Sequence, residues 1–183
     1  MPNPSGRDDH PCRSTRAARS HRRESWFGHG QITSTEKSGF GRFLDDIVYA
    51  FADVSLPLIP FLWYVRVGAP NRFFGLKTSA FVGWMTMVVV TALIRGGWLP
   101  PLATETRGWV SLAPALLLFR LVYFNAVLAV VAYGGGTVAN AMGLPLVSVA
   151  FSMGIASVGI AAFPRLAELF CDRFLVSGVR PGD

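Results

Sequence analysis

The sequence predicts an all-α integral membrane bundle of four transmembrane helices that follows a disordered, basic N-terminal tail. Hydrophobic residues make up 51% of the 183 residues, and the mean hydropathy is +0.41. Only 15% of the residues are charged, whereas a soluble domain carries about 25%. The charges are also segregated, because eight of the 17 Lys and Arg residues precede Asp45 and three follow Phe163. Long apolar runs with few charges between them are typical of a multi-spanning membrane protein.

The clearest of these runs extends from Trp109 to Tyr133 and contains one charged residue, Arg120, close to its middle. A helix rises about 1.5 Å per residue, so this run is long enough to cross a hydrocarbon core of about 30 Å.

The first 38 residues are polar, rich in Pro, Gly, Ser, Arg and His, and without helical or strand periodicity. We therefore expect a disordered cytosolic tail over residues 1–38. Its arginines could instead contact anionic lipid, and a third reading is that residues 1–31 are not part of the protein. No apolar run starts before residue 40, so no cleavable signal peptide is predicted.

The transmembrane domain is predicted over residues 39–163, and its first span over residues 43–65. One helical stripe of this segment is polar, and it consists of Arg42, Asp46, Tyr49 and Asp53. Pro57 and Pro60 remove backbone donors, so we expect the helix to kink or break there. A re-entrant segment is the alternative.

The remaining spans are predicted over residues 78–99, 110–133 and 138–163, followed by a short cytosolic tail over residues 164–183. Two prolines after Leu99 end the second span, and Arg95 near that end is expected to reach the lipid headgroups. The third span is expected to end in a mobile hairpin made by Gly134, Gly135 and Gly136.

The distribution of basic residues predicts that both termini are cytosolic. With four spans, thirteen Lys and Arg fall on the inner side and three on the outer side. Richness in Ala, Gly, Val and Arg favours a GC-rich prokaryotic genome, so we expect the protein in the plasma membrane of a prokaryote.

The candidate site is an ion pair between Asp53 and Arg120. An ionisable residue inside a span is costly and therefore marks a functional or structural site. Counted from the cytosolic ends of their helices, both residues lie about ten positions deep, which predicts the same depth in the bilayer. Hydrogen-bonding neighbours are expected from Tyr49, Tyr123 and Asn125.

Several functions are disfavoured by what the sequence contains. The pattern of His10, Cys12, His21 and His29 fits no metal finger, and no histidine follows His29. No phosphate-binding glycine loop or nucleophile elbow occurs, so neither an enzyme nor a cofactor is predicted. The basic residues form no stripe interleaved with aromatics, so nucleic-acid binding is not expected.

Two functions remain. The first is a structural or accessory subunit that packs in the lipid bilayer with itself or with a larger membrane complex. The second is a small transporter or channel-like protein that moves a proton, ion or small solute through a midplane site at Asp53 and Arg120.

Overall fold

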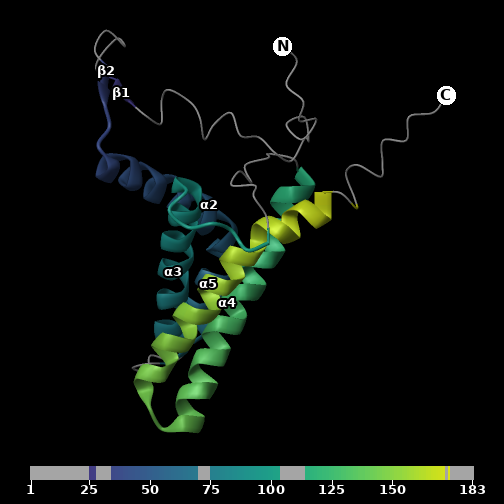
Figure 1. Ribbon diagram of the computed structural model, residues 1–183. Coiled ribbons are helices and arrows are strands. Elements are labelled where there is room, and N and C mark those ends of the chain that lie inside the picture. Colours follow the sequence, from purple (N-terminus) through teal and green to yellow (C-terminus); the bar gives the residue numbers. More distant parts are fainter. Residues whose placement is uncertain (1–24, 28–33, 70–74, 104–113, 172, 174–183) are drawn as a thin grey trace, which may run out of the picture.

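The computed structural model describes residues 25–27, 34–69, 75–103, 114–171 and 173 (Figure 1). Four long helices dominate these residues: α2 (Gly39–Gly68), α3 (Leu76–Gly96), α4 (Pro114–Met142) and α5 (Pro145–Cys171). Each is long and apolar enough to cross a membrane, as the sequence predicted. The helical class of the fold is therefore confirmed, and a membrane protein is compatible with it.

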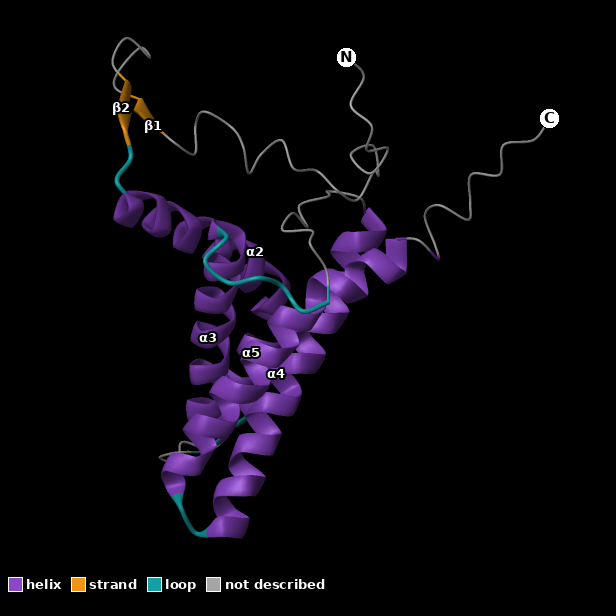
Figure 2. Cartoon of the chain, in the orientation of Figure 1, coloured by secondary structure: helices purple, strands orange, loops and turns teal. Residues whose placement is uncertain are grey.

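A short antiparallel hairpin precedes α2, formed by β1 (Ser25–Phe27) and β2 (Ser34–Glu36) (Figure 2). The expectation of a wholly irregular tail is wrong for these residues. Aromatic and β-branched residues favour strands, and Trp26 pairs with Thr35 across the hairpin. Lys37 and Ser38 are also described, and the rest of the tail lies outside the described residues.

The helix α2 is continuous through both of its prolines, so the predicted break at Pro57 and Pro60 does not occur. Its start is capped by Ser38, whose Oγ accepts a hydrogen bond from the backbone N–H of Gly41 at 3.1 Å. The first turns of α2 run across the end of α3, at the side of the bundle (Figure 1). A full crossing by α2 and the alternative of a re-entrant first segment both stay predictions.

The helix α3 packs against each of the other three helices and lies beside α5 in Figures 1 and 2. It ends earlier than the predicted residue 99 because Gly97 adopts φ +77°, a left-handed conformation suited to glycine. The backbone N–H of Trp98 then donates to the carbonyl of Leu93 at 2.9 Å, which closes the last turn.

The helix α4 continues through Gly134, Gly135 and Gly136, so the predicted hinge at these residues is wrong. The actual turn to α5 is made by Gly143, which has φ +65°, and Pro145 follows as the first residue of the next helix. Glycine costs about 1 kcal/mol in a helix, and close packing offsets that cost here. A side chain at position 135 would come within 2.5 Å of Ser79 Oγ and 3.0 Å of Ser152 Oγ, so three helices approach closely at this glycine.

The core is apolar and continuous through the bundle. The aromatic rings of Phe119, Tyr123 and Phe163 stack between α4 and α5, with centroids 5.4–5.8 Å apart. The largest fully buried side chains of the four helices are Val54, Leu58, Met87, Thr91, Ile94, Leu116, Leu128, Val131, Ile160 and Phe163, together with Asp46. A carboxylate among these residues points to a charged site within the bundle.

Candidate functional site

The last turn of α3 carries Arg95, which pairs with two aspartates of α2. Its Nε lies 3.6 Å from Oδ1 of Asp46, and its Nη1 lies 3.5 Å from Oδ2 of Asp53. The two aspartates are seven residues apart, so they occupy one face of α2 two turns from each other. One guanidinium therefore links two turns of α2 to the end of α3.

These three side chains differ in their exposure. Asp46 is 1% exposed, Arg95 14% and Asp53 34%. A carboxylate as buried as that of Asp46 is very unfavourable without a cation beside it. Arg95 supplies that cation, so Asp46 depends on Arg95 more than Asp53 does.

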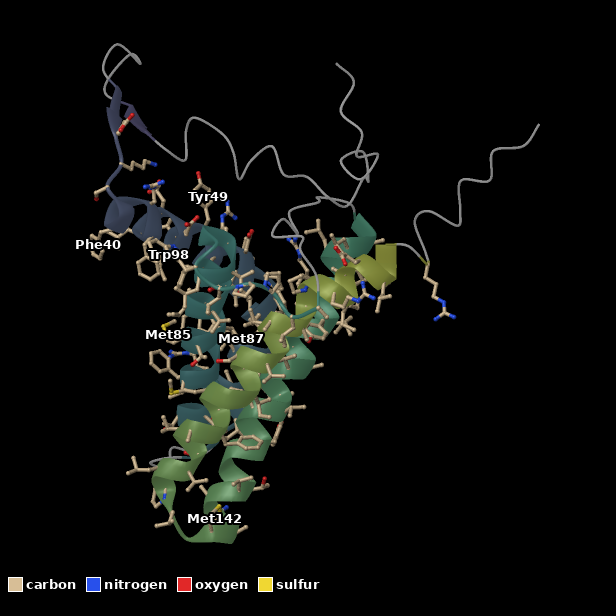
Figure 3. The ribbon with its side chains drawn as sticks, viewed as in Figure 1. Phe40, Tyr49, Met85, Met87, Trp98 and Met142 are labelled. Carbon is tan, nitrogen blue, oxygen red and sulfur yellow. The ribbon has the colours of Figure 1, made fainter. Side chains whose placement is uncertain are left out.

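Tyr49 and Gly96 lie beside the arginine and its partner. The ring of Tyr49 lies 4.7 Å from Cζ of Arg95, a cation–π contact at the exposed edge of the cluster. A side chain at Gly96 would clash with the indole of Trp98 and come within 3.0 Å of Oδ2 of Asp46. Figure 3 shows Tyr49 and Trp98 at the same end of the bundle, opposite Met142.

The second cation, Arg120, is 5% exposed and belongs to α4. Together with Asp53 and Thr91 it lines a cavity of about 10 Å³, and the negative charge of Asp53 acts on it electrostatically. The ion pairs among the described residues nevertheless do not include Asp53 with Arg120. The two residues line one cavity, but the direct ion-pair partner of Asp53 is Arg95.

The position of Arg120 along its helix also differs from the expectation. The helix α4 extends to Met142, so Arg120 lies six residues after Pro114, about 9 Å along the helix axis, and 22 residues before its end. The charged residues therefore gather near one end of the bundle. We call Asp46, Asp53, Arg95 and Arg120 the charge cluster.

The other predicted neighbours of the pair bind elsewhere. Asn125 Nδ2 donates to the carbonyl of Pro57 at 2.7 Å and to that of Leu121 at 2.6 Å. The hydroxyl of Tyr123 donates to the carbonyl of Gly159 at 2.8 Å. Both residues tie α4 to a neighbouring helix and contribute no hydrogen bond to the charge cluster.

Sequence reasoning missed Arg95 as a partner because its place near the end of an apolar run is typical of an arginine that reaches the headgroups. A usable signal was present in the polar stripe of α2. Asp46 and Asp53 share one helical face within an apolar segment, and Arg95 near the end of the next helix is a candidate cation for them.

The described part of the chain contains no group of three His, Cys, Asp or Glu residues arranged to hold a metal ion. With two carboxylates and two guanidiniums, the charge cluster is formally neutral. Its arrangement can hold three helices in register and can accept a molecule no larger than water.

Comparison with known proteins adds a family and no activity. Neither a curated protein nor a solved structure matches the chain. One family model, described as a domain of unknown function (DUF8215), matches residues 37–170, which include all four helices and the whole charge cluster. The chain therefore belongs to the DUF8215 family.

Proposed function

We propose that this protein is a structural or accessory subunit in a membrane. The charge cluster holds its helices together and does not move ions or solutes across the bilayer. The observation that carries the proposal is the pairing of one buried arginine with two aspartates, which joins α2 to α3. Buried ion pairs of this kind fix how helices are arranged, and they destabilise a protein strongly when one partner is lost.

The size of the cavity favours a structural role over a transport role. Its volume of about 10 Å³ is close to the smallest that can hold one water molecule. An organic solute needs many times that volume. The runner-up function, a small transporter, is therefore restricted to a proton or a particle of the size of water at Asp53 and Arg120.

The outer face of α2 supports packing with a second membrane protein. Its side chains Leu56, Ile59, Trp63 and Val67 are 55–70% exposed and lie on one helical stripe. Lipid alone can cover such a face, and a neighbouring helix of the same or another chain can cover it equally well. We propose the latter, with the protein in the plasma membrane of a prokaryote and both termini in the cytosol.

Two variants separate the structural role from the transport role. In Asp53→Asn, the structural role predicts reduced abundance and a lower unfolding temperature in detergent, with no loss of flux per folded molecule. The transport role predicts normal abundance with abolished proton or ion flux in liposomes. Arg165→Gln is the matched control, because Arg165 is 51% exposed and pairs only with the nearby Glu168 within the described residues.

Purification in a mild detergent tests the accessory role directly. A second membrane protein, or a second copy of the chain, should elute with the protein in fixed stoichiometry. A monomer that elutes alone from every mild detergent, with wild-type stability, would contradict the accessory role.

A further inference from the structure

A groove lies between the end of α2 and the start of α3, at the end of the bundle opposite the charge cluster. Its volume is about 820 Å³, and its walls include Leu62 and Arg66 from α2 and Lys77, Phe81 and Trp84 from α3. Among the described residues, its lining includes two basic side chains and no carboxylate. The groove is therefore positively charged, whereas the charge cluster is formally neutral.

The polarity of the groove changes along its length. One helical face of α3 carries Lys77, Ala80 and Trp84 in succession. The distance from Lys77 to Trp84 along the helix axis is about 10 Å. On α2, Leu62 lies one turn deeper than Arg66. Both helices thus place their cation at the mouth of the groove and their apolar side chains farther toward the middle of the bundle.

The mouth of the groove belongs at the headgroup level of a membrane. Trp63, which is 67% exposed, adjoins the groove residue Leu62 on α2, and Tyr64, which is 56% exposed, faces α4 at the same level. Aromatic residues of this kind collect at the interface between hydrocarbon and water. The cations thus lie where lipid phosphates lie, and the apolar part of the groove lies where acyl chains lie.

We propose that this groove binds an anionic phospholipid, with the phosphate between Arg66 and Lys77 and an acyl chain along Leu62, Phe81 and Trp84. Two cations on separate helices favour a headgroup with a net negative charge over a zwitterionic one. The apolar part of the groove, about 10 Å long, can hold part of an acyl chain. It would contribute nothing to the binding of a soluble anion. This site does not rest on the proposed accessory role, because it requires only that α2 and α3 lie in a membrane, although Val67 borders both the groove and the face proposed for a protein partner.

The test is native mass spectrometry of the full-length protein, titrated with phosphatidylglycerol and with phosphatidylcholine of identical acyl chains. We expect phosphatidylglycerol to bind about tenfold more tightly, and the double variant Arg66→Gln/Lys77→Gln to bind both lipids equally. The control double variant Arg42→Gln/Arg165→Gln removes two charges at the opposite end of the bundle and should keep the preference.

Three further results separate this proposal from its alternatives. Equal binding of the two lipids by the wild type would overturn it, and so would a preference that survives the Arg66→Gln/Lys77→Gln change. Displacement of the lipid by millimolar glycerol phosphate would overturn the role of the acyl chain. If the double variant unfolds, the single variant Arg66→Gln replaces it, because the side chain of Arg66 is exposed.

Discussion

The Nη1 atom of Arg95 lies 3.5 Å from Oδ2 of Asp53, so the last turn of α3 is bound to the middle of α2. The same guanidinium reaches Asp46 two turns away, with Nε 3.6 Å from Oδ1. The helices of this bundle are thus held by one shared cation as well as by apolar packing, and the following predictions test that arrangement.

Removal of the cation should be severe. In Arg95→Met, the carboxylate of Asp46 stays buried and loses the guanidinium whose Nε lies 3.6 Å from its Oδ1, and we expect a loss of about 3–5 kcal/mol in the free energy of unfolding. Denaturation in mixed detergent micelles measures this loss. Arg165→Gln should cost less than about 0.5 kcal/mol, because the side chain of Arg165 is 51% exposed and pairs with Glu168 three residues away on the same helix. Equal effects of the two variants would show that Arg95 is not a structural cation.

The partner of Asp53 can be identified by double-mutant cycles. Asp53→Asn combined with Arg95→Gln should show a coupling energy of about 1–3 kcal/mol, because the two side chains pair directly. Asp53→Asn combined with Arg120→Gln should show a smaller coupling, since only their electrostatic attraction links them. A larger coupling energy for Asp53 with Arg120 than for Asp53 with Arg95 would instead support the direct Asp53–Arg120 pair that the sequence predicted.

Gly135 should tolerate no side chain. In Gly135→Ala, the new Cβ would lie 2.5 Å from Ser79 Oγ and 3.0 Å from Ser152 Oγ, so we expect a loss of about 1–3 kcal/mol. Gly136→Ala is the matched control, because no atom lies within 4 Å of its Cβ position. That variant should be neutral or stabilise the helix by up to about 1 kcal/mol. Destabilisation by both variants would indicate a turn at these glycines in place of a continuous helix.

Gly143 should be sensitive to substitution for a different reason. Its φ of +65° is unfavourable for residues with a Cβ, so Gly143→Ala should cost about 1–2 kcal/mol although its surroundings are open. Gly154→Ala in the middle of α5, where the Cβ position is also open, is the control and should not destabilise. Both variants are compared by their unfolding midpoints in detergent, and a neutral Gly143→Ala would argue against the left-handed turn.

The number and location of the four helices could be predicted because burial in lipid requires long apolar runs, and such runs are visible in the sequence. Their ends were less predictable, since they depend on packing. Three consecutive glycines indicate a turn when read alone, and only the approach of Ser79 and Ser152 explains why α4 continues through Gly135.

The candidate site was predicted in part. Asp53 and Arg120 were placed at one depth, and they do line one cavity. The direct partner of Asp53 was not predicted, because ionisable residues near the end of a span can either reach the headgroups or turn inward. Which of the two occurs at Arg95 depends on how α2 crosses the end of α3, and a linear sequence does not contain that crossing.

The charge cluster lies at the end of the bundle where α2 and α4 begin and where α3 ends. A chain inserted with the start of α2 on the side of synthesis never carries these four charged side chains past the centre of the bilayer. The opposite insertion would move each of them through it, at about 2.5–3.5 kcal/mol per residue. The placement of these four charges therefore favours insertion with the start of α2 on the side of synthesis, and in that direction Arg66 and Lys77, at the other end of the bundle, are the described cations that must cross.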